Sequence, residues 1–344
     1  MRVLSMLVIF TLLSACKSPS EGSAGATVAA ELEGAPIPEY QVEVKAGQPQ
    51  GGPPQPWNFW IDPESPAASA AKRLRADQDE GADLLDIIAT QPVASWYSLA
   101  EKESLLRLTR QMTEAAAQDE FALMVIDGLP YRSCTADQAI NPGLGTSYKI
   151  WMQKLVQAIG SGRALVIFEP TAMSSLDCLS PVQKEERWSL MRFGVKELNR
   201  ARQALIYIDA GSQSLKLDEV ALQLEKSGIE WARGFAINTG GYQTTRISSE
   251  RGMELRKRFP TKTFVIDTGR NGKGPSPQAG ADLCNPRGRA LGENPTSKTS
   301  LVGLDAYLWI KQPGESDGPC DRDDPPAGAF SSELAIDLAR NAGY

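Results

Sequence analysis

The chain of 344 residues contains no histidine. This absence excludes Ser-His-Asp and Cys-His catalysis, and it excludes zinc sites built on imidazole ligands. Any acid–base chemistry must therefore rest mainly on carboxylates, tyrosine, lysine or water. The chain also lacks an excess of basic residues, since 36 lysines and arginines stand against 42 aspartates and glutamates, a net charge of −6. This balance argues against nucleic acid as a partner.

A largely apolar run lies near the N-terminus, from Leu4 to Leu13, after the positively charged Arg2. It is too short to span a bilayer as a resident helix. It ends in Leu-Ser-Ala-Cys16, which resembles the lipobox of bacterial lipoprotein signal peptides. We therefore expect residues 1–16 to be a signal peptide ending at a lipidated Cys16, with the exported protein held at a membrane, on its periplasmic or cell-surface side, by the lipid alone. The alternative is an ordinary secretory signal with an incidental cysteine.

The remaining chain divides into two parts by composition. Residues 17–56 are rich in Ser, Gly, Ala and Pro and keep no helical or strand period, which predicts a flexible tether. In residues 57–344, short apolar segments alternate with segments of helical period, which predicts one folded domain.

The pattern of that domain predicts an α/β fold. The expected strands cover residues 57–61, 92–97, 121–127, 164–168, 204–208, 231–237, 263–266 and 305–310. The expected helices cover residues 67–75, 83–89, 100–118, 148–159, 181–202, 217–226, 248–259 and 331–342. The strands are apolar throughout rather than at alternate positions, which is typical of a parallel sheet covered on both faces. This many units favour a closed (β/α) barrel, and a doubly wound open sheet is the alternative.

Polar residues gather in five motifs at or after the expected strands. The motifs are Val125-Ile-Asp-Gly-Leu-Pro-Tyr-Arg-Ser-Cys134, Leu165-Val-Ile-Phe-Glu-Pro-Thr171, Asp267-Thr-Gly-Arg-Asn-Gly272, Cys284-Asn-Pro-Arg-Gly-Arg289 and Leu308-Trp-Ile-Lys-Gln-Pro-Gly-Glu-Ser-Asp-Gly-Pro-Cys320. Together they resemble glycoside hydrolase family 6, the inverting endoglucanases and cellobiohydrolases. The resemblance implies a distorted (β/α) barrel over residues 57–344, action on a β-1,4-linked glucan or related polysaccharide, no cofactor or metal, and a monomer.

The resemblance also implies which residues form the cleft. Asp317 is the candidate catalytic base, which assists the attacking water directly or indirectly. Six positions are implied to bind the sugar chain: Trp96, Arg132, Asn238, Asn285, Lys311 and Glu315. Further polar positions of the family are matched by Asp267, Arg270 and Asp282. The alternatives are a core position for the tryptophan, an ion pair with Glu169 for Arg132, and loop solvation or barrel-rim hydrogen bonds for the others.

The chain departs from the family pattern at both central carboxylates. Where the family has a general acid at the end of a Glu-Pro-Asp motif, the chain reads Glu169-Pro-Thr171, and a threonine hydroxyl is far too weak an acid for that step. Where the family has the aspartate that tunes this acid, the chain has Ser133. Two hypotheses follow: a glucanase whose hydrolysis is weak or lost, and a non-catalytic glycan-binding lipoprotein.

A third departure is Asp127, where the family has a tyrosine at the sugar being cleaved. One hypothesis is that this carboxyl group, among apolar strand residues and facing other carboxylates such as Asp317, has a raised pKa and partly replaces the lost acid. The alternative is an inert Asp127 in an ion pair with Arg132 or Lys311.

Aromatic platforms for sugar rings are also missing. The family has a histidine and stacking tryptophans after Asp209-Ala-Gly211, but this chain reads Ser212-Gln-Ser-Leu-Lys216. Leu283 stands where the family has another tryptophan. Stacking on aromatic faces is a main way to hold a pyranose ring, so these losses argue against a long cellulose-type tunnel.

Four cysteines remain besides the one in the lipobox, and four allow three disulfide pairings. Cys134 and Cys178 follow successive expected strands, while Cys284 and Cys320 flank the last one. These two pairs also match the disulfides of the family, and an exported location allows them to form. The alternative is four free, buried thiols.

Overall fold

The computed structural model describes residues 55–130, 142–170, 172–173, 176, 178–277, 284–320 and 322–344. Its strands are β1 (Ser95–Tyr97), β2 (Ala122–Ile126), β3 (Ala164–Phe168), β4 (Ala204–Asp209), β5 (Gly234–Ile237), β6 (Thr263–Asp267) and β7 (Leu304–Leu308). Its helices are α2 (Pro66–Ala76), α3 (Gly81–Ala89), α4 (Ser104–Ala117), α5 (Pro142–Ile159), α6 (Pro181–Leu198), α7 (Leu217–Lys226), the 3-10 helix η1 (Ile229–Trp231), α8 (Thr245–Arg256) and α9 (Ser332–Ala342).

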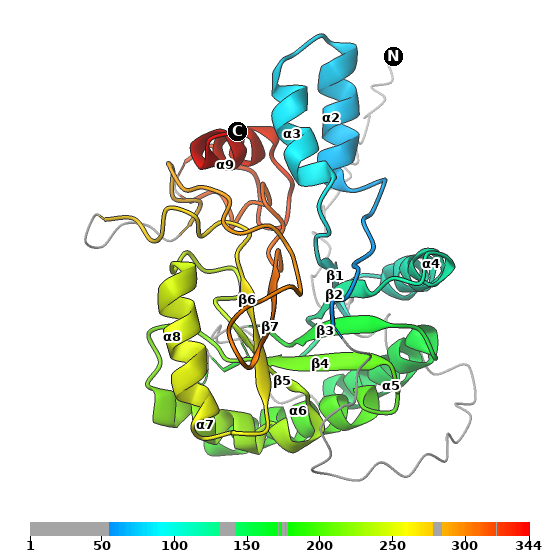
Figure 1. The fold of residues 1–344 in the computed structure, drawn as a ribbon. Helices are drawn as coiled ribbons and strands as arrows, with labels where there is room; N and C mark the ends of the chain where they lie inside the picture. Colours follow the sequence, from blue (N-terminus) through cyan, green and yellow to red (C-terminus); the bar gives the residue numbers. More distant parts are fainter. Residues whose placement is uncertain are drawn as a thin grey trace, which may run out of the picture.

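The seven strands form one parallel sheet in the order of the sequence, from β1 to β7. The sheet curls, and helices α4 to α8 lie around its outside (Figure 1). Its two edges meet where Val93, just before β1, bridges to Trp309, just after β7. The expected distorted barrel is confirmed. The doubly wound alternative is wrong, because such a sheet reverses its strand order at a switch point.

The strands are apolar throughout because each of their two faces meets an apolar layer. In β2, Leu123 and Val125 belong to a cluster made by strand residues inside the curl. Ala122, Met124 and Ile126 belong to the larger cluster that the outer helices complete. Both faces are therefore covered, which is the usual condition of a parallel sheet.

Several helices begin at a side chain that caps their first turn. The hydroxyl oxygen of the capping residue accepts a hydrogen bond from a backbone N–H three residues further on, which satisfies a donor that the helix leaves free. The residues that do this are Ser65 for α2, Ser180 for α6, Thr244 for α8 and Ser331 for α9.

Two expected strands differ from the structure. In residues 57–61 only Phe59 makes a bridge, to Phe121. The reason is that β1 occupies the same edge of β2 from Met124 onward, which leaves only the start of that edge open. Residues 231–237 are divided, because η1 ends at Trp231 and β5 begins at Gly234.

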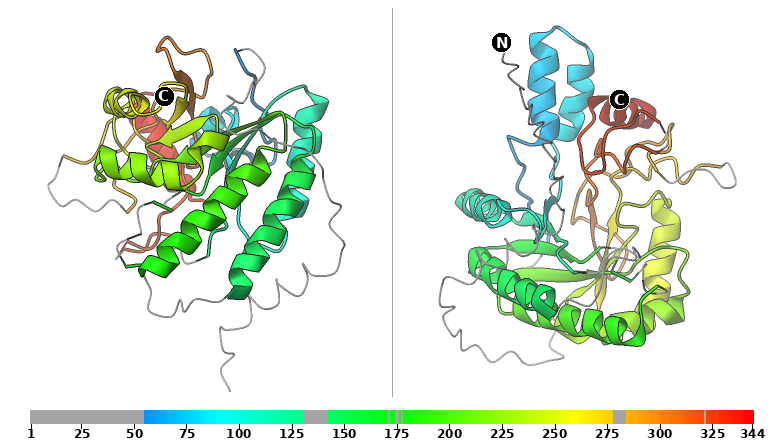
Figure 2. Two further views of the ribbon diagram at one scale, coloured as in Figure 1. Left: turned by 90° about the horizontal axis from the view of Figure 1, so that it is seen from below. Right: turned by 180° about the vertical axis from the view of Figure 1, so that it is seen from behind.

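A helical hairpin of α2 and α3 rises from one end of the barrel, with α9 packed against it (Figures 1 and 2). The three helices share a separate apolar cluster that includes Leu85, Ala335 and Trp309. Because Trp309 directly follows β7, this cluster fixes the chain that leaves the last strand. The polar loop after β7 therefore starts from a rigid base.

Candidate functional site

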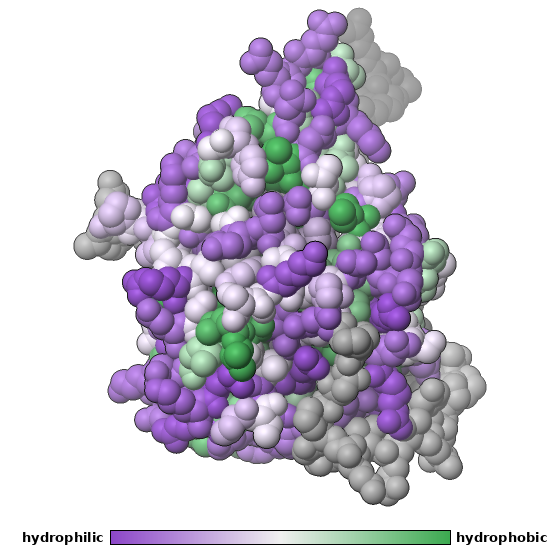
Figure 3. Space-filling view, in the orientation of Figure 1, coloured by the Kyte–Doolittle hydropathy of each residue, from purple (hydrophilic) through white to green (hydrophobic). Residues whose placement is uncertain are grey.

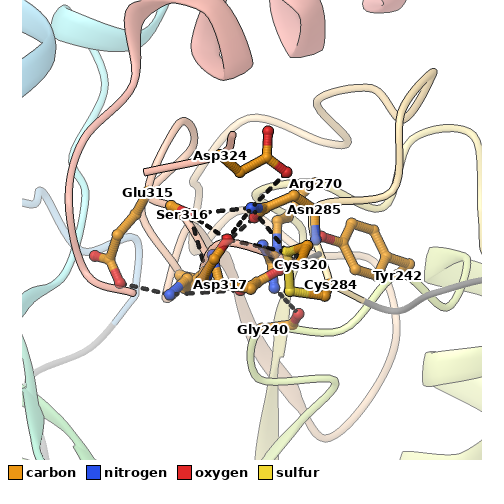
Figure 4. A network of polar contacts seen from close by, with 12 residues as sticks. Gly240, Tyr242, Arg270, Cys284, Asn285, Glu315, Ser316, Asp317, Cys320 and Asp324 are labelled. Atoms are coloured by element: carbon orange, nitrogen blue, oxygen red, sulfur yellow. Dashed lines mark hydrogen bonds and ion pairs between the residues drawn. A yellow bond between two sulfur atoms is a disulfide. The ribbon is translucent and has the colours of Figure 1, made fainter. Parts of the chain in front are cut away.

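A polar cluster at the carboxyl end of β7 is centred on Asp317 (Figure 4). Oδ2 of Asp317 lies 2.8 Å from Nη1 of Arg270, and Oδ1 lies 3.7 Å from Nζ of Lys311. Lys311 also pairs with Glu315. The hydroxyl of Tyr242 donates a hydrogen bond to Oδ2 of Asp317 at 3.3 Å. The sequence predicted Asp317, Lys311 and Glu315 as parts of one site, and the structure brings them together.

The charges of this cluster decide the protonation state of Asp317. Burial raises the pKa of Asp317, but the charge and hydrogen bond of Arg270, together with Lys311, outweigh burial and hold the pKa below its usual range. Asp317 is therefore ionised at neutral pH. A carboxylate with a low pKa is a weak proton acceptor, so it is better suited to orienting and polarising water than to direct proton abstraction.

Asn285 holds the loop of Asp317 in place. Its side chain is buried, its Oδ1 accepts a hydrogen bond from the Asp317 amide at 2.7 Å, and its Nδ2 donates to Oγ of Ser316 at 3.0 Å. The disulfide Cys284–Cys320, which was expected, ties the same two loops together. The side-chain amide of Asn285 is thus engaged by the protein, and its direct contact with sugar stays a prediction.

Asp267 lies buried at the end of β6 and connects three loops. Its carboxylate accepts four backbone hydrogen bonds, from Gly240 at 2.8 Å, Gly269 at 3.0 Å, Ile310 at 3.1 Å and Lys311 at 2.9 Å. Burial raises the pKa of Asp267, and these amide bonds oppose the rise. The loops after β5, β6 and β7 therefore share one acceptor.

Asn238 shapes the turn after β5. Its backbone has a φ of 64°, in the left-handed region that asparagine tolerates better than most residues. Its Nδ2 donates to the carbonyl of Asp267 at 2.9 Å, and its Oδ1 accepts from the amide of Gln243 at 3.1 Å. Like Asn285, it supports the site from within, and its contact with sugar stays a prediction.

Trp96 lies on β1, beside the loop after β7. Its indole N–H donates to the carbonyl of Ile310 at 2.9 Å, and Nζ of Lys311 lies 5.9 Å from the centroid of its ring. The ring packs against the inner apolar cluster but is only partly buried. The sequence left two positions open for Trp96, one in the core and one in the cleft. The structure places the ring against the inner apolar core and also beside Lys311 of the Asp317 cluster.

A cavity of about 250 Å³ lies beside the cluster, at the ends of β4 and β5. Asp209, Gln213, Thr239 and Tyr242 are among its lining residues, and most of the others are polar or glycine. Nε2 of Gln213 and Oγ1 of Thr239 are buried and make no hydrogen bond within the described part of the chain. Buried polar groups normally have a partner, so these two atoms beside the cavity hold hydrogen-bonding capacity that the described residues do not use.

Sequence reasoning missed the roles of Gln213 and Tyr242. It read the segment after Asp209 only as the place of lost aromatic platforms. Which polar atoms there lack a partner depends on how the loops after β4 and β5 fold together. Tyr242 links the cavity to the Asp317 cluster, because it lines the first and hydrogen-bonds within the second.

Asp127 is buried directly after β2, with 7% of its surface exposed. Its amide donates to the carbonyl of Tyr97 on β1 at 2.9 Å. Among the described residues, Lys311 pairs with Glu315 and Asp317. The expected alternative, an ion pair of Asp127 with Arg132 or Lys311, stays a prediction.

Several predicted residues lie outside the part of the chain that the structure describes: Cys16, Arg132, Ser133, Cys134, Thr171 and Asp282. Cys178 is in a disulfide. Its pairing with Cys134 stays a prediction.

The profile of glycosyl hydrolases family 6 matches residues 55–342. The chain belongs to this family. It is 36% identical over 299 residues to "Endoglucanase A" of Cellulomonas fimi, covering 85% of this chain and 63% of that protein. It is 31% identical to "Endoglucanase A" of Thermobispora bispora, covering 83% of this chain and 62% of that protein. The chain thus spans less than two thirds of these curated relatives.

The family 6 fold is shared with solved structures. The endoglucanase Cel6 from Mycobacterium tuberculosis, in complex with methyl-cellobiosyl-4-deoxy-4-thio-β-D-cellobioside, superimposes with a TM-score of 0.77 at 38% identity. That match covers 86% of this chain and 99% of the other. The endoglucanase CEL6B from Humicola insolens matches at a TM-score of 0.71, 18% identity, 83% of this chain and 97% of that chain, which supports the fold alone.

No helix in the described part of the chain is both long and apolar enough to cross a membrane. The same residues contain no group of three or more Cys, Asp or Glu side chains placed to hold a metal ion.

Replacing Asp317 with asparagine is expected to lower the free energy of unfolding by about 3 kcal/mol at pH 7, because the buried Arg270 keeps its charge without its carboxylate partner. The folded-state pKa of Asp317 is depressed below the unfolded value of about 3.9. The contribution of ionised Asp317 to the free energy of unfolding is therefore complete above the unfolded pKa, and it is lost as the pH falls through the folded pKa.

Urea unfolding of the wild type and Asp317→Asn between pH 7 and about pH 2.5 checks this prediction. The difference in the free energy of unfolding between the wild type and Asp317→Asn should become smaller below about pH 4. Glu315→Gln is the matched control, because Lys311 then keeps Asp317 as a partner, and its loss should be smaller. A difference that stays constant down to the lowest pH would contradict the ion pair.

Proposed function

We propose that this family 6 domain binds a β-1,4-linked glucan, or a related polysaccharide, in the cleft at the carboxyl ends of its strands. The observation that supports this proposal most directly is the position of the Asp317 cluster beside the polar cavity, with Lys311 and Glu315 on the same loop. Similarity to an endoglucanase whose structure holds a thio-linked cello-oligosaccharide supports this ligand class. Lysine, carboxylate and amide groups at the rim offer hydrogen bonds to sugar hydroxyls.

We also propose that the domain hydrolyses the glucan slowly and with inversion. In such a reaction, water attacks the anomeric carbon on one face while an acid protonates the leaving oxygen on the other. Asp317 is ionised and lies at the rim, so it would orient the attacking water, directly or through a second water. The positions of the family acid and of its tuning aspartate hold Thr171 and Ser133, so the rate is expected to be low.

A glycan-binding protein without turnover is the second candidate. The same two substitutions favour it, because both central carboxylates of the family pattern are replaced while the neighbouring ion pairs are kept. A binding site needs only the hydrogen-bonding groups of the cleft, whereas hydrolysis also needs a proton donor at the leaving oxygen.

A glycan array with the domain, run beside a reducing-sugar assay on cello-oligosaccharides, separates these functions. Retention with slow turnover is expected. Retention without turnover would leave the binding protein, and neither retention nor turnover on any β-1,4-linked glycan would refute both.

We further propose that the mature protein begins at a lipidated Cys16 and is anchored to a membrane by that lipid. The support is the apolar run that ends in Leu-Ser-Ala-Cys16, followed by the polar segment of residues 17–56. Mass spectrometry of the mature N-terminus should find an acylated cysteine. Cys16→Ser should abolish acylation. A free N-terminus several residues downstream, with soluble release of the wild type, would refute the anchor.

A further inference from the structure

The cavity at the ends of β4 and β5 has polar walls and little aromatic surface. Its volume is about 250 Å³, below the roughly 300–1,000 Å³ of pockets that hold drug-sized ligands, so it has room for about one sugar unit. Tyr242 supplies the only aromatic ring among the described lining residues, and the guanidinium of Arg270 lies 4.5 Å from the centroid of that ring. One face of the ring is therefore closed to stacking. A sugar in this cavity has to be held mainly by hydrogen bonds.

The charge of the lining favours an uncharged ligand. The described lining residues include no lysine or arginine, whereas Asp209 contributes a carboxyl group. Oδ2 of that carboxyl group accepts a hydrogen bond from the amide of Gly211 at 2.9 Å, which holds it at the end of β4. A negatively charged ligand group would meet Asp209 with no basic side chain in the lining to compensate.

Two side chains of the lining carry polar atoms that make no hydrogen bond with the described residues. The atoms are Nε2 of Gln213, on the loop after β4, and Oγ1 of Thr239, on the loop after β5. Both are covered by neighbouring protein atoms. Rotating either side chain toward the cavity breaks no hydrogen bond to the described residues, and the terminal torsion of a glutamine is broad. A ligand hydroxyl group would then satisfy polar atoms that burial otherwise leaves unpaired.

Arg251 of α8 holds the segment that carries Gln213. Nη2 of Arg251 donates to the carbonyl of Ser212 at 3.3 Å and to the carbonyl of Leu215 at 2.7 Å, one on each side of Gln213. The backbone at Gln213 is therefore fixed from the outer layer of helices. A group on a fixed backbone loses less freedom when it binds a ligand, and this lowers the cost of binding.

Asp267 fixes the turn that carries Thr239. The residue before Thr239, Asn238, donates to the carbonyl of Asp267 at 2.9 Å, and the residue after it, Gly240, donates to the carboxylate of Asp267 at 2.8 Å. Thr239 is thus held on both sides, and its hydroxyl oxygen stays without a partner in the described part of the chain. The two loops therefore bring one unpaired polar atom each to the same cavity.

The cavity borders the Asp317 cluster. Tyr242 lines the cavity, and its hydroxyl lies 3.3 Å from Oδ2 of Asp317. Gly240 also lines the cavity, and its carbonyl accepts a hydrogen bond from Arg270, the ion-pair partner of Asp317 (Figure 4). A sugar unit in the cavity would therefore lie close to the part of the same glucan chain that contacts the cluster.

We propose that this cavity binds one uncharged sugar unit through hydrogen bonds to Gln213 and Thr239, and that these two residues determine specificity there. The proposal rests on the glucan binding proposed above and names the residues that read the ligand. The loop after β4 lacks the stacking aromatic residues of the family pattern, and these two polar side chains take their place. A site that hydrogen-bonds a ligand hydroxyl group rejects ligands without it more strongly than an apolar pocket rejects a missing methylene.

Calorimetry with cellotetraose tests the two residues one at a time. Gln213→Met keeps the length of the side chain without its amide, and Thr239→Val keeps the shape without the hydroxyl. Each variant is expected to bind cellotetraose about 5- to 10-fold more weakly than the wild type, the usual effect of one lost hydrogen bond. Thr239→Ser keeps a hydroxyl group and should bind nearly as tightly as the wild type.

Gln203→Met and Thr113→Val are the matched controls. Nε2 of Gln203 donates to a backbone carbonyl at 2.6 Å, and the hydroxyl of Thr113 donates to another at 2.8 Å, so both groups already have protein partners. Neither residue lines the cavity. The two controls should bind cellotetraose as the wild type does. If Gln213→Met and Thr239→Val also do so, the proposal is wrong.

Urea unfolding separates a role in binding from a role in the fold. Gln213→Met and Thr239→Val remove polar atoms that have no partner in the described part of the chain, so the urea midpoint should stay the same or rise. Weaker binding with an unchanged midpoint is the expected result. Weaker binding that comes with a lower midpoint in both variants would show that the two groups hold the fold, and it would overturn their role in specificity.

The ligand class is tested with cellotetraose whose C6 hydroxymethyl groups are oxidised to carboxylates. This anionic ligand should bind the wild type about 10-fold more weakly than cellotetraose, because Asp209 repels it. Equal or tighter binding of the oxidised ligand would refute the preference for an uncharged sugar unit.

The failure of this proposal is distinct from the failure of the proposed function. If the wild type binds cellotetraose and both cavity variants bind it equally well, the roles of Gln213 and Thr239 are refuted and glucan binding stands. If the wild type does not bind cellotetraose, glucan binding is refuted and the sugar subsite is refuted with it.

Discussion

The double change Thr171→Asp with Ser133→Asp is expected to raise the rate of cellotetraose hydrolysis about 100- to 10,000-fold, the usual contribution of a positioned general acid. The first substitution supplies a carboxylic acid after Glu169-Pro170, where the family pattern has its acid. The second supplies the aspartate that tunes the protonation of that acid. Reducing-sugar release from cellotetraose at several pH values measures the gain.

The matched control is Thr171→Asn with Ser133→Asn, which has nearly the same shape and no acid. It should leave the rate at the wild-type level. A double aspartate variant that binds cellotetraose and is no faster than the control would mean that the cleft has lost more than its acid.

Asp267→Ala is expected to lower the free energy of unfolding by roughly 4 kcal/mol, about 1 kcal/mol for each of the four buried or partly buried amides left without an acceptor. The three loops that share this carboxylate should also loosen, so cellotetraose affinity should fall. Urea denaturation measures the first effect and calorimetry the second.

Asp267→Asn is the graded comparison for this prediction. It keeps one oxygen acceptor and replaces the other by a donor that faces amides, so its loss should be smaller than that of Asp267→Ala and still clear. If both variants unfold at the wild-type urea concentration, the amides have found other acceptors and Asp267 does not hold the three loops.

The sequence predicted the barrel because continuous apolar strands and intervening helices impose a covered parallel sheet. It also predicted that Lys311, Glu315 and Asp317 act together, since they share one short loop. It failed for residues 57–61, where the apolar pattern of a strand is present but β1 already occupies the partner edge. Competition for an edge is a property of the assembled sheet and is not visible in a local pattern.

The use of individual side chains was harder to predict than their location. Asn238 and Asn285 lie at the site as expected, yet their amides are hydrogen-bonded to the protein. Glu169 was considered only as a partner for Arg132, whereas the structure surrounds it with amides and Tyr148. Such partners come from loops that meet only in the folded chain, so residue type and spacing do not specify them.

The junction of β1 and β7 gives the domain a weak seam beneath its cleft. Each other pair of neighbouring strands has at least three registered residue pairs. The junction of β1 and β7 has only the bridge between Val93 and Trp309. Two hydrogen bonds accompany this bridge, from the amide of Ala94 to the carbonyl of Trp309 and from the indole of Trp96 to the carbonyl of Ile310. Local opening favours regions with few such bonds, so amide hydrogen exchange should be fastest along this line. A polysaccharide that contacts Trp96 on one side and Lys311 on the other would connect the two strands across this junction. Bound ligand would then suppress local opening of the barrel, and the melting temperature of the domain would rise with ligand concentration.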